Sequence, residues 1–393
     1  RGKNPTLTIF NTLNWKRSEM LTVYIDFEVI PRNQFFEITD FQGHSLKVQP
    51  IRYRREGCYY AIFAEDIPPM GYKTFEIVFK QPSTDTGTIT INNASIENHF
   101  YKLQLNPDKG TIQSLYDKEL NCELVDSSSP WELGAFIYEK LGNRDQLAQY
   151  RLDDYNRTGL SECRIIDSSN GPIYQRILLQ GKSPGTDEAF GVNLEIKLYH
   201  DTKRIELEYA IKRLPETDPS GIYVAFPFQL PEGKLAFDVQ GGTVISGKNQ
   251  LEGTSTDWNT VQNFVSVQNN QAQIIIGSSL IPLYQLGDIN LGKFQYQKQY
   301  ERPHVYSWVM NNYWNTNFKA SQEGEFRWSY HLTSSVDPSN NLATKFGWSS
   351  RIPLYARVMP TGTENHKPTE YSAFHFEKDN FLMTSCTPSK EEG

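Results

Sequence analysis

The chain has 393 residues, with 39 basic and 46 acidic side chains and a formal net charge of −7 at pH 7. Its length suggests roughly two to three domains, and 38% hydrophobic with 22% charged residues is too apolar a composition for a disordered chain. No apolar run reaches the ~18 residues of a membrane span, and the mildly acidic sequence without Lys or Arg blocks gives no indication of nucleic-acid binding.

The first eighty or so residues contain several short runs in which apolar and polar side chains alternate. These runs lie at residues 6–10, 21–27, 59–64 and 74–79, and a polar, turn-rich segment follows at residues 81–87. Alternation with a period of two is typical of strands with one buried face. We therefore predict a small β-sandwich at residues 1–82.

The same alternation continues over the next 250 or so residues. It appears at residues 100–105, 175–180, 192–198, 205–211 and 326–332. The runs at 192–198 and 205–211 are joined by a short polar turn, which predicts an antiparallel hairpin. The best helical stretch, residues 143–150, is short. Since no linker rich in Gly and Ser divides this part, we predict one large sandwich at residues 88–335.

A weaker break follows where Ser, Asp, Pro and Asn gather at residues 334–341. The remainder, residues 342–393, is predicted to be a C-terminal β segment that is truncated at its end. Regular short strands without long helices make the expected fold class all-β.

Candidates for metal binding and catalysis are few. Of seven histidines, only His375 has an acidic residue two positions on, Glu377, which would place both side chains on one face of a strand. An ordinary exposed strand explains this pair better. Asp238, Asp257 and Asp288 offer carboxylates, but turn or cap roles are the simpler interpretation. We predict no metal site and no catalytic residue in this chain.

The densest cluster of candidate binding residues lies at residues 308–318, where four Asn are interspersed with four aromatic side chains. Amides can bond sugar hydroxyls, and an aromatic face packs on the C–H face of a pyranose. Packing of these aromatics in the core is the competing interpretation. The candidate substrate-binding residues are Asn311, Asn312, Tyr313, Trp314 and Asn317. A weaker cluster of the same kind lies at residues 257–263.

A series of motifs in a fixed order carries a resemblance to a known family. The series begins with FNTLNWKRS at residues 10–18 and a hairpin motif at residues 96–118. Further motifs lie at residues 226–228, 239–242, 250–253, 261–265, 283–289 and 311–318. Together they resemble the C-terminal β-region of bacterial-type glycoside hydrolase family 38 α-mannosidases, over about residues 7–385.

This resemblance implies a fold and a division of labour. Family members are retaining, zinc-dependent exo-α-mannosidases in which a catalytic barrel and a helical domain precede the β domains. The large sandwich is then a galactose-mutarotase-like supersandwich. Zinc is expected on His and Asp residues of the missing catalytic domain. One of these Asp residues is also expected to be the nucleophile, and a second Asp of the barrel is expected to be the acid/base. This chain has no positions that match those residues.

The function that the resemblance implies is therefore that of non-catalytic β domains. They would pack on the barrel and the helical domain of the parent enzyme and help to wall the pocket for an α-mannoside. No cofactor, nucleic acid or membrane partner is expected, and the chain alone is predicted to be inactive.

Two alternatives remain open. One is a stand-alone carbohydrate-binding or scaffold β-sandwich protein, which the reading frame upstream of residue 1 would distinguish. The other is a self-contained mutarotase, which needs a His base and a carboxylate in one concave sheet. His331 with Glu323, or His200 with Glu206, could supply such a pair.

Overall fold

The computed structural model describes residues 4–81, 94–317, 319–362, 368–374, 376–378 and 380–387. Residues 82–87 of the predicted linker, His375, Phe318 and the chain end at 388–393 lie outside the described residues. The chain divides into two compact units. The small unit comprises Arg1–Thr88, Gly171–Ile173 and Ile352–Gly393, and the large unit comprises Ile89–Asn170 and Tyr174–Arg351.

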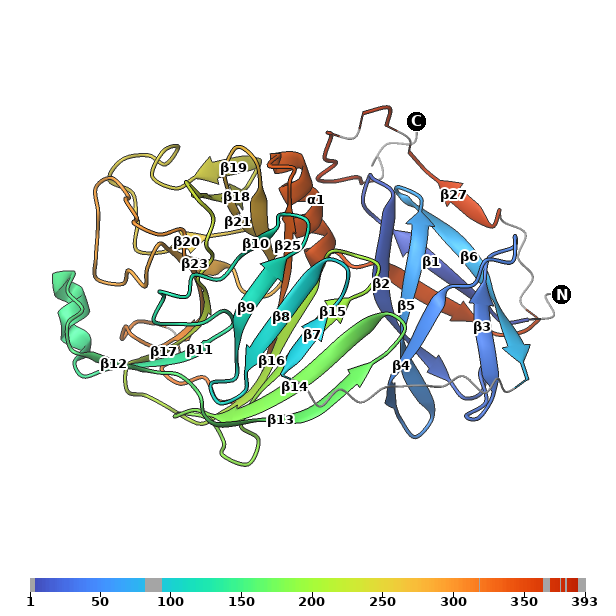
Figure 1. The fold of residues 1–393 in the computed structure, drawn as a ribbon, viewed down its shortest axis with the longest axis horizontal. Coiled ribbons are helices and arrows are strands. Elements are labelled where there is room, and N and C mark those ends of the chain that lie inside the picture. Colours follow the sequence, from blue (N-terminus) through green and yellow to red (C-terminus); the bar gives the residue numbers. More distant parts are fainter. Residues whose placement is uncertain are drawn as a thin grey trace. The chain divides into compact units, whose positions relative to one another are not determined.

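The predicted all-β class is confirmed. Strands form the sheets of both units, and the helices within the described ranges are η1 (Arg144–Gln149) and α1 (Asn340–Arg351) (Figure 1). The short helical stretch predicted at residues 143–150 is η1, a 3₁₀ helix whose N-terminus is capped by the side chain of Asn143.

The small unit is built from two antiparallel sheets. One has the order β26-β1-β6-β27 with β3 also on β6, and the other has the order β2-β5-β4. The strands are β1 (Thr6–Asn11), β2 (Arg17–Asp26), β3 (Phe35–Thr39), β4 (Lys47–Tyr53), β5 (Gly57–Ile67), β6 (Gly71–Lys80), β26 (Tyr355–Met359) and β27 (Glu370–Ser372). Alternation along β1 turns Leu7 and Ile9 into the core, as the period of two predicts.

The large unit has three sheets. Their orders are β13-β14-β15-β16-β25-β22-β21-β18-β19, β12-β11-β17-β24-β23-β20 and β10-β9-β8-β7. The first twelve strands are β7 (Ser95–Glu97), β8 (Tyr101–Asn106), β9 (Thr111–Asp117), β10 (Cys122–Glu123), β11 (Phe136–Leu141), β12 (Tyr155–Thr158), β13 (Ser161–Asn170), β14 (Tyr174–Lys182), β15 (Val192–Tyr199), β16 (Ile205–Arg213), β17 (Ser220–Phe226) and β18 (Lys234–Val239). The others are β19 (Gly242–Ile245), β20 (Asn259–Thr260), β21 (Phe264–Gln268), β22 (Gln273–Gly277), β23 (Leu283–Leu286), β24 (Val305–Asn311) and β25 (Gly324–Ser335).

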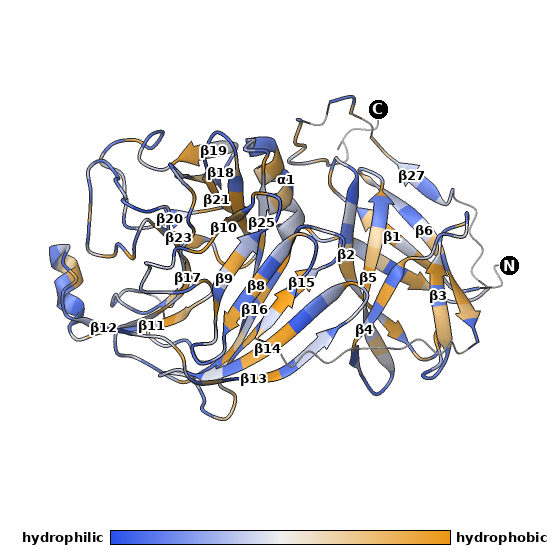
Figure 2. Ribbon diagram, in the orientation of Figure 1, coloured by the Kyte–Doolittle hydropathy of each residue, from blue (hydrophilic) through white to orange (hydrophobic). Residues whose placement is uncertain are grey.

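One core lies between these sheets. The predicted hairpin is β15 paired with β16, in a register that places Leu194 opposite Tyr209 and Ile196 opposite Leu207. These inward side chains pack in one cluster with apolar residues of the other two sheets. The alternation shows as bands of orange and blue along β14 (Figure 2). A second, aromatic-rich cluster covers the other face of the six-stranded sheet, and it underlies the candidate site.

The last part of the chain differs from the separate β segment predicted at residues 342–393. Helix α1 belongs to the large unit, where Leu342 and Phe346 pack against buried Phe264 and Ile275. Leu342 and Phe346 are four residues apart, which is helical spacing and not strand spacing.

The two strands after α1 return to the small unit. In β26, Ala356 lies opposite Ile9 and Val358 lies opposite Leu7, so the inward faces of β26 and β1 match. Strand β27 pairs with the opposite edge of β6. The small unit is therefore completed by residues far from its beginning in the sequence.

Candidate functional site

The predicted site residues lie in a loop that follows β24, here called the candidate loop (residues 311–317). Asn311 ends β24 and pairs with Gly221 of β17. The position of the loop is therefore set by the middle of the six-stranded sheet.

Asn312 anchors this loop inside the protein. Its side chain is 9% exposed. Its Oδ1 accepts hydrogen bonds from the backbone N–H (2.7 Å) and the hydroxyl (3.2 Å) of Ser220, and its Nδ2 donates to the carbonyls of Glu216 (2.8 Å) and Ala320 (3.1 Å). An amide has two donor hydrogens and two acceptor lone pairs. All four are used within the protein, so Asn312 lies in the site as a support for the loop.

Tyr313 is also fully buried. Its hydroxyl donates to Oε1 of Glu139 at 2.5 Å, and the carboxylate of Glu139 also pairs with the guanidinium of Arg157. Burial, with the nearby Tyr223 and Glu139, raises the pKa of Tyr313 well above its usual value, so the phenol stays protonated. The ring lies across Gly221, where an added Cβ would be 2.0 Å from the Tyr313 hydroxyl. Glycine is thus required beneath Tyr313.

A cation from η1 holds the backbone of the loop. Arg144 donates from Nε to the carbonyl of Tyr313 (2.9 Å) and from a terminal nitrogen to the carbonyls of Asn312 (3.2 Å) and Thr217 (2.8 Å). Bonds from a charged donor are about twice as strong as neutral ones. The candidate loop is therefore anchored through its backbone as well as through its buried side chains.

Four aromatic rings meet beside the loop. Trp308 lies 5.7 Å from Trp258, 5.8 Å from Tyr313 and 6.1 Å from Trp314, between ring centroids. Trp308 and Tyr313 are buried, whereas Trp258 and Trp314 are half-buried. The structure thus joins the two aromatic clusters that the sequence presents separately. Two of the rings fill the core, and two keep an open surface.

The two remaining predicted residues differ from Asn312. Asn311 is half-buried and Asn317 is exposed. Within the described part of the chain, neither side-chain amide makes a hydrogen bond. Asn311, Trp314 and Asn317 are therefore the predicted residues whose side chains retain the capacity to contact a ligand.

The three candidate carboxylates are each paired with groups of this chain. Asp238 accepts hydrogen bonds from the backbone N–H groups of Gln262, Asn263 and Phe264, between 2.7 and 3.1 Å. Asp257 accepts one from the backbone of residue 292 at 3.2 Å, and Asp288 pairs with a lysine at 2.9 Å. The predicted turn and cap roles are not what the structure shows for Asp238 and Asp257, because their partners lie on distant segments of the chain.

The structure pairs His331 with Glu206, which combines one residue from each of the two candidate His–acid pairs. His331 lies beside Glu206, with 3.7 Å between Nδ1 and Oε2, because the two residues are cross-strand neighbours on β25 and β16. Glu323 pairs instead with Lys319, and His200 contacts Asn170. Burial lowers the pKa of His331 to about 3, which is far below that of an efficient general base at neutral pH.

Among the residues that the structure describes, no three His, Cys, Asp or Glu side chains are grouped so that they could hold a metal ion. No helix in those residues is long and apolar enough to cross a membrane.

The sequence reasoning missed the residues that support the loop. Glu139, Arg144 and Arg157 belong to β11, η1 and β12, more than 150 residues before their partner loop. No local motif connects them to residues 311–317. Only covariation between distant positions could have indicated these contacts.

The comparisons with solved structures agree with the observed fold. A structure of a protein in the glycosyl hydrolase family 38 from Enterococcus faecalis is similar over 94% of this chain and 49% of its own, with 14% sequence identity and a TM-score of 0.66. An alpha-mannosidase from Enterococcus faecalis V583 is similar over 94% of this chain and 47% of its own, with 14% identity and a TM-score of 0.68. The chain thus spans about half the length of each.

A galactose mutarotase-like protein from Lactobacillus casei ATCC 334 also matches, over 63% of this chain and all of its own, at 14% identity and a TM-score of 0.37. No curated protein matches the sequence. The family model for the glycosyl hydrolases family 38 C-terminal domain matches residues 96–294, just over half of the chain. This match confirms the resemblance carried by the sequence motifs: the chain belongs to the C-terminal domain of glycosyl hydrolase family 38.

Proposed function

We propose that the chain forms the non-catalytic C-terminal β domains of a longer α-mannosidase that is retaining, zinc-dependent and exo-acting. The observation that carries this proposal is the family membership, and the similarity of 94% of the chain to about half of an alpha-mannosidase supports it. In this proposal the β domains pack on a catalytic barrel and a helical domain, and the substrate is an α-mannoside.

The reacting groups are proposed to lie outside this chain. Retention requires two carboxyl groups about 5–5.5 Å apart on either side of the glycosidic bond. The carboxylates singled out in the sequence, Asp238, Asp257 and Asp288, are each paired with groups of this chain. The zinc ion and both catalytic acids are therefore assigned to the barrel, an assignment that rests on the resemblance of the sequence.

The candidate loop is proposed to wall the sugar pocket. Trp314 and Trp258 offer partly open ring faces, and Asn311 and Asn317 offer amides beside them. The hydrogen bond that Tyr313 donates to Glu139, and those that Arg144 donates to the loop carbonyls, anchor the loop that carries Trp314. A fixed wall can position a sugar and exclude water without taking part in the chemistry.

One experiment tests the division of labour. The 393-residue chain is incubated with an aryl α-mannoside, with and without added zinc. We expect release of the aryl group at the background rate in both cases, because the chain is proposed to lack the acids that retention needs. Turnover above background would overturn the proposal.

A second experiment tests the wall. In the longer protein, Trp314→Ala is expected to lower kcat/KM for the aryl mannoside by about tenfold or more, because a stacking surface is lost. Tyr53→Ala, which removes an aromatic side chain 57% exposed on β4, is the matched control and should leave kcat/KM unchanged. An unchanged kcat/KM in a folded Trp314→Ala protein would remove the loop from the site.

A further inference from the structure

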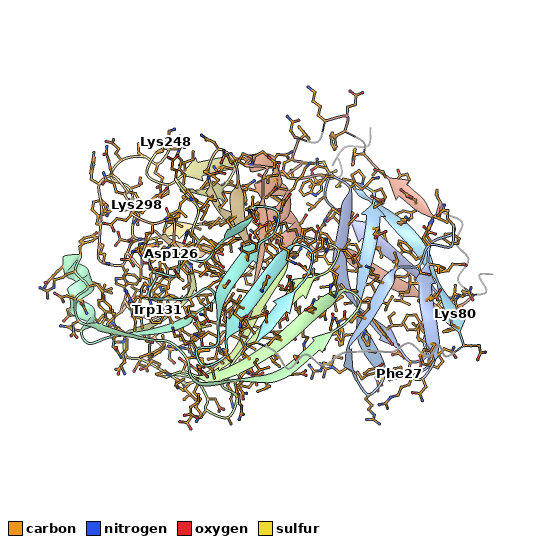
Figure 3. The ribbon with its side chains drawn as sticks, viewed as in Figure 1. Phe27, Lys80, Asp126, Trp131, Lys248 and Lys298 are labelled. Carbon is orange, nitrogen blue, oxygen red and sulfur yellow. The ribbon has the colours of Figure 1, made fainter. Side chains whose placement is uncertain are left out.

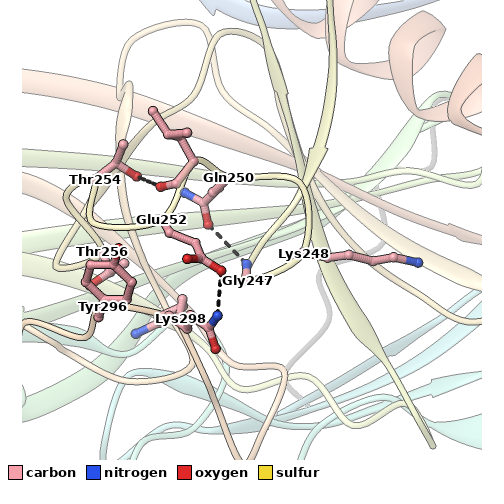
Figure 4. Close-up of a pocket in the computed structure, with 10 residues that line it drawn as sticks. Gly247, Lys248, Gln250, Glu252, Thr254, Thr256, Tyr296 and Lys298 are labelled. Atoms are coloured by element: carbon pink, nitrogen blue, oxygen red, sulfur yellow. Dashed lines mark hydrogen bonds between the residues drawn. The ribbon is translucent and has the colours of Figure 1, made fainter.

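A cavity with no candidate-loop residue in its lining lies between the connection that follows β19 and the connection that precedes β24. It has a volume of about 300 Å³ and is here called the Lys298 pocket. Its walls include Gln250, Glu252, Thr254, Tyr296, Gln297 and Lys298 (Figure 4). This volume is at the lower end of the range for ligand sites, about 300–1,000 Å³, so the pocket suits a small ligand.

The two connections that form the walls are bonded to each other. Gln297 donates to the carboxylate of Glu252 at 2.6 Å, and the backbone N–H of Gly253 donates to the carbonyl of Tyr296 at 3.2 Å. Gly253 has φ +77°, and a Cβ there would lie 3.2 Å from the Tyr296 ring. The pocket is therefore preformed, with an aromatic ring packed closely on one wall.

Lys298 is the unusual member of this wall. Its residue is only 6% exposed. Within the described residues, its ammonium group makes no hydrogen bond and has no carboxylate within 4.0 Å. Burying an ammonium group without a partner is costly, so a protein ordinarily pairs it or changes its protonation.

The nearest acids do not supply that partner. Asp257 and Asp288 act on Lys298 only through space, since Asp257 accepts from a backbone N–H and Asp288 pairs with Lys293. Burial lowers the pKa of Lys298 to about 8, against the opposing attraction of the two acids. At pH 7 the amine is still mostly protonated, so the pocket contains an ammonium group without a direct carboxylate partner; the Glu252 carboxylate in the same wall is bonded to Gln297.

The rest of the wall is polar and offers both donors and acceptors. Gln250 accepts from the N–H of Gly247 at 3.1 Å and donates to Asn259 at 2.9 Å, which leaves one further donor and one further acceptor on its amide. The hydroxyl of Thr254 donates to the carbonyl of residue 251 at 2.7 Å and can still accept. Such groups suit the hydroxyls of a sugar-like molecule.

We propose that the Lys298 pocket binds a small, polyhydroxylated ligand with one anionic group, a carboxylate or a phosphate, which pairs with the Lys298 ammonium group. The hydroxyls of this ligand contact Gln250, Thr254 and Glu252. The site goes beyond the proposed mannosidase role and does not depend on it, because binding is a property of this chain alone.

The test is isothermal titration calorimetry of the 393-residue chain at pH 7 with glucuronate, glucose 6-phosphate and glucose. We expect at least one of the two anions to bind at least about tenfold more tightly than uncharged glucose, because charge-assisted bonds are the stronger ones. The two anions distinguish a carboxylate ligand from a phosphate ligand. If neither anion binds, or if glucose binds as well as both, the proposal is wrong.

Two lysine variants identify the site. Lys298→Met keeps the side-chain length and removes the charge, and it should weaken anion binding by about tenfold or more. Lys182→Met is the matched control, because Lys182 is a partly exposed lysine of β14 in the large unit that does not line the pocket. Lys248, which lies at the same edge of the large unit as Lys298 (Figure 3), also lines the pocket and is left unchanged. Equal losses in both variants would indicate diffuse surface charge and overturn the assignment. If Lys298→Met does not fold, the comparison of anions with glucose on the wild-type chain still decides.

Discussion

At the scale of single residues, the candidate loop separates groups that support from groups that are free to bind. Asn312 and Tyr313 are buried and bonded within the large unit, whereas Trp314 and Asn317 keep exposed surface. Residue type alone predicted the same role for all of them. The difference arises from burial, because a buried amide must find partners inside the protein.

Replacement of Asn312 should therefore affect folding before it affects binding. Asn312→Ala removes four hydrogen bonds and leaves the backbone N–H of Ser220 without its amide partner. We expect the free energy of unfolding to fall by about 2 kcal/mol or more, measured by urea denaturation. Asn317→Ala, at an exposed position of the same loop, should change it by no more than about 0.5 kcal/mol. Equal effects of the two variants would contradict this role.

His331 makes stability depend on pH. Its pKa is about 3 in the folded protein, against an ordinary value of 6.5, because burial and Arg204 oppose its protonation despite the attraction of Glu206. Between these two values the unfolded chain binds a proton that the folded chain does not. Stability is therefore full above about pH 6.5 and falls as the pH is lowered, by up to about 1.4 kcal/mol per pH unit.

The variant His331→Gln should reduce that slope. Urea denaturation between pH 4.5 and 6.5 avoids the acid range in which Glu206, whose pKa lies below its usual value, is protonated. Near pH 8 the difference in unfolding free energy between wild type and variant should be constant. A slope that is identical in both proteins over the lower range would show that His331 is protonated in the folded state.

At the scale of elements, close contacts between strands and loops decide which residues are tolerated. Strand β17 carries Gly221 directly beneath the ring of Tyr313, and this contact sets how the candidate loop lies on the sheet. In the sequence this glycine only precedes an apolar run that begins at Ile222. Its role follows from the approach of a side chain that is ninety-two residues further along the chain.

Gly221→Ala should displace Tyr313. The added Cβ would lie 2.0 Å from the Tyr313 hydroxyl, so the ring must move away from Glu139. We expect a loss of about 1–3 kcal/mol in unfolding free energy by urea denaturation. Gly242→Ala on β19, where an added Cβ meets nothing within 4 Å, is the matched control and should be close to neutral. An unchanged unfolding free energy in Gly221→Ala would mean that the Tyr313 ring can move without loss of stability.

At the scale of the whole molecule, the order of elements along the chain differs from their grouping in space. The small unit takes strands from both ends of the sequence, β1 to β6 and then β26 and β27. Leu354, just before β26, is 4% exposed and lies in the core cluster of the small unit. The small unit is therefore incomplete without the residues that follow α1.

Deletion of residues 352–393 should destabilise the small unit selectively. It removes β26, β27 and Leu354, and we expect the unfolding free energy of the small unit to fall by about 3 kcal/mol or more. Limited proteolysis with mass spectrometry should then show cleavage within residues 6–80 while residues 95–351 stay protected. Deletion of residues 388–393 alone is the control. Equal protection of residues 6–80 in both deletions would contradict this account.

The sequence alone determined the strands with regular alternation, the all-β class, the hairpin of β15 and β16 and the family. Each of these depends on short-range alternation or on the linear order of motifs, which local chemistry records directly. The aromatic cluster was visible too, but the division between its core rings and its open rings was not.

Only the tertiary structure decided the rest. It placed β26 and β27 in the small unit, turned residues 340–351 into a helix on the large unit, and brought Glu139 and Arg144 to the candidate loop. It also enclosed Lys298 in a pocket without a partner. The physical reason is the same in each case: burial and pairing depend on contacts between residues far apart in the sequence, and no local pattern records which distant groups will meet.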